Sequence, residues 1–183
     1  MAFESKFWRN QIKRDINYLN KKMKVNVRNL NEEENDCLYS QIEIKLFTIT
    51  YSLRKLMDTK KFPDNVGKKR INISKYKRND KKQIRPFGLF DDYYFLDNKS
   101  SEFITLRYLC GQFVHAYFFQ PIPDKKGNIK KLFFVSNSAK EDGIYSLSIT
   151  LLLKNILKIC DKYPDSIDYH FDEEKEGYAV NCK

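Results

Sequence analysis

The feature that most constrains the fold is an apolar stripe in the region 32–60. Its leucines and isoleucines follow one another at steps of three or four residues, which is the spacing of one face of an α-helix. The stripe consists of Leu38, Ile42, Leu46, Ile49, Leu53 and Leu56. The letters E-E-E-N near its start give an acidic first turn, and Pro63 follows its end. We therefore expect one long amphipathic helix over 32–60, with the stripe packed into a core.

Shorter patterns predict the remaining elements. Helical spacing of apolar residues indicates further helices, and alternation of apolar and polar residues indicates antiparallel hairpins. The further helices are expected over 4–24, from a cap at Ser100 or Ser101 to Phe119, and over 150–163. The hairpins are expected over 132–136 with 143–149 and over 166–172 with 176–182.

These elements predict an α+β fold. We expect a predominantly helical bundle of three to four helices, with a small antiparallel β-sheet in the C-terminal third. The length of 183 residues fits a single domain. Within it, residues 1–120 should form a helical body with a basic insertion at 60–85, and residues 121–183 a small α/β appendage packed on that body.

The composition favours a reduced protein of the cytoplasm. Four cysteines and two histidines are scattered without a C-x-x-C pair. This pattern favours core cysteines over a disulfide framework or a zinc site, although it leaves a metal cluster of dispersed Cys and His open. The longest apolar run, 144–153, is too short to span a bilayer, and the N-terminus has no apolar signal region. We expect a cytoplasmic protein with no metal, no cofactor and no membrane partner.

Positive charge is concentrated in one segment. The chain has a net charge of +10, and residues 60–85 contain eleven Lys or Arg but only two Asp, a balance of +9. Residues 161–183 have the opposite balance, −4. The basic segment should be an exposed loop or ribbon with a short β-like piece over 70–76. It either binds the phosphates of nucleic acid or is only a solvated loop in a lysine-rich protein.

The nucleic-acid reading names particular side chains. The expected phosphate contacts are Lys68, Lys69, Arg70, Lys75, Lys77, Arg78, Lys81, Lys82 and Arg85. The rings available for stacking on bases are those of Tyr76, Phe87, Tyr93 and Tyr94.

Two cationic residues stand out in the apolar, aromatic stretch 106–119. Arg107 and His115 are eight residues apart, and eight residues of α-helix turn by about 800°, so the two side chains can share a face two turns apart. Burying both would be costly without a partner. Either they line a functional cleft, or they reach solvent or pair with an acid such as Glu43.

Two phrases in the chain resemble the HEPN superfamily. They are T-Y-S-L-R-K-L-M-D-T-K-K-F, residues 50–62, and L-R-Y-L-C-G-Q-F-V-H-A-Y-F-F, residues 106–119. Members of that superfamily are helical, often dimeric, metal-independent ribonucleases and their inactive relatives, common in toxin–antitoxin and phage-defence systems. Their signature is an Arg, four to six residues, and then a His, late on a helix that faces a symmetry-related copy.

The resemblance implies that Arg107 and His115 are catalytic. Seven residues separate them here, and Gly111 stands where the family often has a polar residue. A glycine inside a helix costs about 1 kcal/mol relative to alanine, so we expect a packing or ligand reason for it. In such a site the histidine transfers a proton and the arginine stabilises the phosphate while the 2′-OH of the RNA attacks.

The function that follows from the resemblance is RNA binding. It implies a homodimeric, metal-independent endoribonuclease of a bacterial toxin–antitoxin or phage-defence system. The alternative is a non-catalytic subunit or regulator that binds a protein partner through the same helical face. A DNA-binding regulator is disfavoured because no helix-turn-helix spacing is recognisable.

Overall fold

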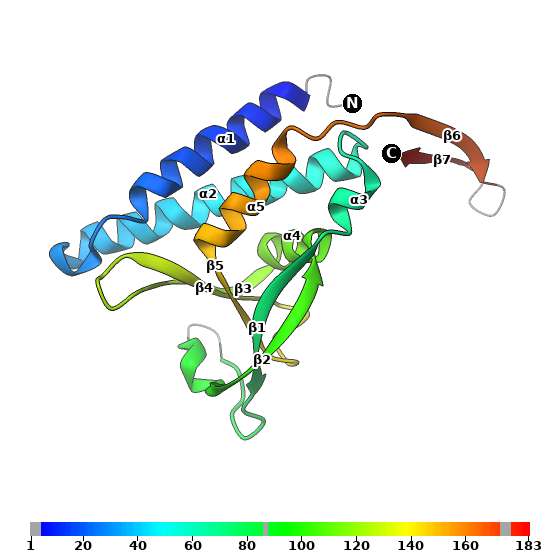
Figure 1. Ribbon diagram of the computed structural model, residues 1–183. Coiled ribbons are helices and arrows are strands. Elements are labelled where there is room, and N and C mark those ends of the chain that lie inside the picture. Colours follow the sequence, from blue (N-terminus) through cyan, green and yellow to red (C-terminus); the bar gives the residue numbers. More distant parts are fainter. Residues whose placement is uncertain (1–4, 86–87, 173–176) are drawn as a thin grey trace.

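The computed structural model describes residues 5–85, 88–172 and 177–183 (Figure 1). The helices are α1 (Ser5–Lys22), α2 (Glu32–Asp58), α3 (Asp64–Gly67), α4 (Leu106–Val114) and α5 (Ile149–Cys160), with short 3-10 turns η1 (Val27–Asn29) and η2 (Phe90–Asp92). The strands are β1 (Arg70–Arg78), β2 (Tyr94–Thr105), β3 (Ala116–Pro123), β4 (Ile129–Ser136), β5 (Ile144–Ser148), β6 (Ile167–Asp172) and β7 (Gly177–Cys182). Among the described residues, no helix is long and apolar enough to cross a membrane.

Five strands form one antiparallel sheet in the order β2-β1-β5-β4-β3, and β6 and β7 form a separate hairpin. The expectation of a helical bundle with a small sheet in the C-terminal third is therefore wrong. The sheet is large and takes in β1 and β2, which lie in regions predicted to be a basic ribbon, an irregular stretch and the start of a helix. In Figure 1 the helices α1, α2 and α5 all lie on one side of this sheet.

The predicted helix from Ser100 or Ser101 to Phe119 is also wrong. Residues 100–105 belong to β2, α4 spans only nine residues, and β3 begins at Ala116. The helix cap is Thr105, whose hydroxyl oxygen accepts a hydrogen bond from the backbone N–H of Tyr108 at 3.2 Å. Edge strand β2 has mostly exposed side chains, so it carries little of the alternation that reveals a strand.

The other predicted elements are confirmed. The long helix begins with a capping box between Asn31 and Glu34 and ends at Asp58. The helices over 4–24 and 150–163 are α1 and α5, and the two hairpins are β4–β5 and β6–β7. The β-like piece over 70–76 is the first part of β1.

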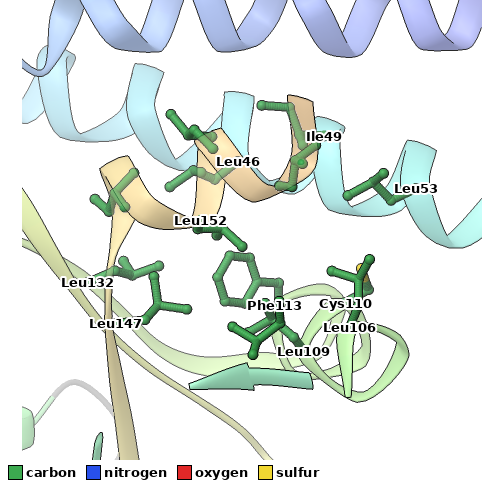
Figure 2. Close-up of a cluster of buried hydrophobic side chains, with 14 of the residues drawn as sticks. Leu46, Ile49, Leu53, Leu106, Leu109, Cys110, Phe113, Leu132, Leu147 and Leu152 are labelled. Atoms are coloured by element: carbon green, nitrogen blue, oxygen red, sulfur yellow. The ribbon is translucent and has the colours of Figure 1, made fainter. Parts of the chain in front are cut away.

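The main hydrophobic core lies between the sheet and the helices (Figure 2). The stripe of α2 is packed into a core, as predicted, and its residues, including Leu46, lie against Phe113 and Cys110 of α4. Leu132 of β4 and Leu147 of β5 complete this core from the sheet. We call the sheet face that carries them the helix-side face.

The opposite face of the sheet, here the outer face, carries a second cluster. Along β4, Phe133 and Val135 point to this face, between Leu132 and Phe134 on the helix-side face. The segment between β1 and β2 covers part of the outer face, since Phe90 stacks on Phe133 with ring centroids 4.8 Å apart. The cover lies over β4 and β3. The cluster also takes in Tyr76 of β1 and Ile144 of β5, so the outer face is open only around Asn72 of β1 and Ser101 of β2.

Candidate nucleic-acid interface

The structure places Arg107 at the start of α4 and His115 just beyond its end. The guanidinium of Arg107 donates to the carboxylate of Asp58, at the end of α2, and Arg54 Nε lies 3.5 Å from the same carboxylate. His115 is the C-terminal cap residue: its backbone N–H donates to Gly111 at 3.1 Å. Both side chains are exposed, and within the described parts of the chain the imidazole has no hydrogen-bond partner.

The helix separates these two residues along its axis. Eight residues of α-helix rise by about 12 Å, so Arg107 and His115 are far apart along the axis. The guanidinium of Arg107 is also bound to the carboxylate of Asp58. Arg107 pairs with Asp58, and not with Glu43. A Cβ atom at Gly111 would meet Arg54 Nη1 at 3.3 Å, and this is the end of a flexible, partly exposed side chain that can shift, so the described residues give no packing reason for the glycine.

The predicted basic residues do not form one patch. Arg70 lies over the ring of Phe103, Lys75 is 3.9 Å from Glu102, and Arg78 is 2.8 Å from Glu141. Consecutive strand residues point to opposite faces, so β1 distributes its cations over both sides of the sheet.

The other predicted basic residues lie in three places. Lys77 is exposed farther along β1, and Lys68 and Lys69 lie between α3 and β1. Lys81, Lys82 and Arg85 lie in the segment after β1, where Lys82 is 3.5 Å from Asp92.

The predicted stacking rings are mostly inaccessible. Tyr76, Tyr93 and Tyr94 are buried in the outer-face cluster, so they cannot stack on bases. Phe87 lies outside the described residues. The expectation that these tyrosines contact nucleic acid is therefore wrong.

A different set of residues forms a groove on the open part of the outer face. It has a volume of about 680 Å³, within the range of sites that hold small ligands. Its lining contains five serines, three lysines and one asparagine, and none of the described lining residues is acidic. They are Asn72, Ile73, Ser74, Lys99, Ser100, Ser101, Lys130, Lys131, Ser146, Leu147 and Ser148. We call it the hydroxyl–lysine groove.

Strand register brings these side chains together. Ser74 of β1 is directly opposite Ser101 of β2 and Ser146 of β5, and Lys131 of β4 is opposite Ser148. Directly opposed residues of antiparallel strands point to the same face. Four strands thus place hydroxyl and ammonium groups on one surface.

Two lining residues of the groove contact the buried hydroxyl of Tyr76. Lys131 Nζ donates to the Tyr76 hydroxyl at 2.8 Å, and the Ser146 hydroxyl is 3.5 Å from the same oxygen. Burial acts to raise the pKa of Tyr76, but these hydrogen bonds and the charges of Lys131 and Lys99 outweigh it, so the pKa lies below its ordinary value. The positive charge of the groove lysines therefore acts on this buried hydroxyl.

One exposed aromatic ring lies beside the groove. Phe103 of β2 is 54% exposed, and the guanidinium carbon of Arg70 lies 4.5 Å from its ring centroid. Phe103 is opposite Asn72, which accepts a hydrogen bond from the Ser101 hydroxyl at 2.9 Å. Phe103 and Arg70 therefore adjoin the lining on the same face.

Most residues of this site were not predicted from the sequence. Lys99, Lys130, Lys131 and the serines lie outside the basic segment or carry no charge. One sequence pattern indicates part of the groove. In the letters S-L-S at 146–148, two polar residues two positions apart share a face of an otherwise buried strand.

Comparisons with known proteins identify no relative. No family model, no curated protein and no solved structure matches the chain. The ammonium, hydroxyl and amide groups of the groove are donors suited to phosphate, and its lining offers no carboxylate to a hard metal ion.

Proposed function

We propose that this protein binds single-stranded RNA through the hydroxyl–lysine groove. The observation that carries the proposal is the lining itself: three lysines and five serines without a carboxylate, beside an exposed ring. Lysines bind the phosphates, and serines donate to phosphate and sugar oxygens. Phe103, with Arg70 on one side, offers a surface on which a base stacks.

The proposal concerns binding and does not depend on Arg107 and His115. Arg107 is engaged by Asp58, and the two residues are at opposite ends of α4. Cleavage by this pair, a homodimer, and a role in a toxin–antitoxin or phage-defence system rest on the resemblance of two short phrases. The RNA-binding part gains support from the groove.

The test compares two lysine variants by fluorescence anisotropy with a labelled 12-nucleotide oligouridine. Lys99→Ala removes an exposed cation of the groove, and Lys126→Ala removes an exposed cation in the turn between β3 and β4. We expect wild type and Lys126→Ala to bind alike and Lys99→Ala to bind about tenfold more weakly. In a plot of log affinity against log salt concentration, we expect the slope for Lys99→Ala to be shallower than that of wild type by about 0.7. This is the value for the loss of one phosphate contact to a single strand.

Three outcomes contradict the proposal. Equal weakening by both variants indicates diffuse attraction to a positive protein, and no saturable binding removes the function altogether. Binding of free uridine phosphate as tightly as the oligomer indicates a small-molecule site in place of an RNA site.

A further inference from the structure

Glu43, an acid on the core side of α2, remains without a partner. It is half-buried, and no hydrogen bond or ion pair within the described chain reaches its carboxylate. Burial raises its pKa above the ordinary glutamate value. A half-buried carboxylate without a donor lowers stability, so a ligand that supplies a positive charge is favoured there.

Glu43 opens into a cavity beside the edge strand β3. The cavity has a volume of about 470 Å³ and lies apart from the hydroxyl–lysine groove. Its lining is Glu43, Gly88, Ala116, Tyr117, Phe118, Phe119 and Gln120. Glu43 is the one carboxylate among these described residues. Of the three aromatic ones, Phe119 points to the helix-side face, whereas Phe118 belongs to the outer-face cluster and Tyr117 packs on it.

Aromatic side chains in the lining favour a bound cation, as the carboxylate of Glu43 also does. The faces of aromatic rings attract ammonium and guanidinium groups. One ring of this lining already holds such a group, since Lys140 Nζ lies 4.1 Å from the centroid of Tyr117. Lys140 also donates to Asn137 at 2.7 Å, and it forms no ion pair with Glu43.

We propose that this cavity binds an organic cation, with the ammonium or guanidinium head on Glu43 and its alkyl part against Phe119 of the edge strand. The inference is independent of RNA binding. Such a head group has two sources: a small amine, or a lysine or arginine side chain of a peptide. The second source is compatible with the place of the cavity, because β3 is at the edge of the sheet and Pro121 and Pro123 occupy only its far half.

The experiment titrates ¹⁵N-labelled protein with two ligands of the same shape. n-Butylguanidinium carries the charge, and n-butylurea is its neutral counterpart. We expect saturable amide shifts in β3 and around Glu43 with n-butylguanidinium, and at least tenfold weaker binding of n-butylurea. In Glu43→Gln the response to the cation should fall at least tenfold, while Glu33→Gln, at an exposed position of the same helix, should respond like wild type.

Folding of the variant is checked in the same samples. Glu43→Gln should melt at or above the wild-type temperature, because it removes an unpaired half-buried charge. An acetylated and amidated arginine pentapeptide separates the sources. Tighter binding than n-butylguanidinium assigns the cavity to a partner's side chain, and weaker binding assigns it to a small amine. Equal binding of the cation and the urea, or an unchanged response in Glu43→Gln, overturns the inference.

Discussion

At the scale of single residues, the least predictable feature is a buried arginine. Arg9 of α1 is 1% exposed, and its guanidinium donates to the backbone oxygens of Cys160 and Lys61, each at 2.5 Å. The rings of Phe62 and Tyr163 lie 4.3 and 4.1 Å from it. One side chain thus joins α1 to the ends of α2 and α5. The sequence shows only a basic residue on an amphipathic helix, because the two acceptors are backbone atoms far away in the chain.

This contact gives a stability prediction. Arg9→Met keeps the apolar stem but leaves two carbonyl oxygens without their donor, so we expect a loss of about 3 kcal/mol in the free energy of unfolding. Arg14→Met, an exposed position of the same helix, should change it by less than about 0.5 kcal/mol. Urea denaturation of both variants measures the difference. If the two variants unfold at the same urea concentration, Arg9 does not join the helices.

At the scale of elements, α2 is the centre of the packing. It lies against α1 on one side and against α4 on the other, and its stripe is fully buried. The helical spacing of its apolar residues is regular because one side of the helix is buried in the core along nearly its whole length. The sequence could therefore predict it.

A matched pair of substitutions tests the role of α2. Leu46→Asp places an unpaired charge in the core shown in Figure 2, and we expect a loss of about 4 kcal/mol or failure to fold. Ile44→Asp introduces the same charge two residues away, where the side chain is 60% exposed, and should leave stability within about 0.5 kcal/mol. Thermal unfolding followed by circular dichroism gives both values. Similar melting of Leu46→Asp and wild type would show that the helix is peripheral.

The strands were harder to predict than the helices. β1 has only Ile71 and Ile73 as inward apolar residues before charged positions, and edge strand β2 is largely exposed. The alternation in β1 was therefore detected only over 70–76, and in β2, which has almost no buried face, there is no period of two to detect. Residues 106–119 have apolar side chains at helical spacing, but this spacing also arises where a short helix leads into a strand that is partly buried.

At the scale of the whole molecule, the sequence gives the net charge but not the positions of the charged side chains on the surface. The net charge of +10 follows from the sequence, but β1 sends its cations to different faces and carboxylates pair with several of them. The groove is assembled instead by residues of β1, β2, β4 and β5 that are up to 76 positions apart, from Asn72 to Ser148. Only strand order and register reveal it.

The most direct test of RNA binding is to locate the RNA on the protein. Titration of ¹⁵N-labelled protein with a six-nucleotide oligouridine reports which backbone amides change their environment. We predict shifts at the groove residues Ser74, Ser101 and Ser146 and at neighbouring Phe103, with little change around Arg107 and His115. Shifts confined to α4 and its two cationic residues, with the groove unaffected, would contradict the account.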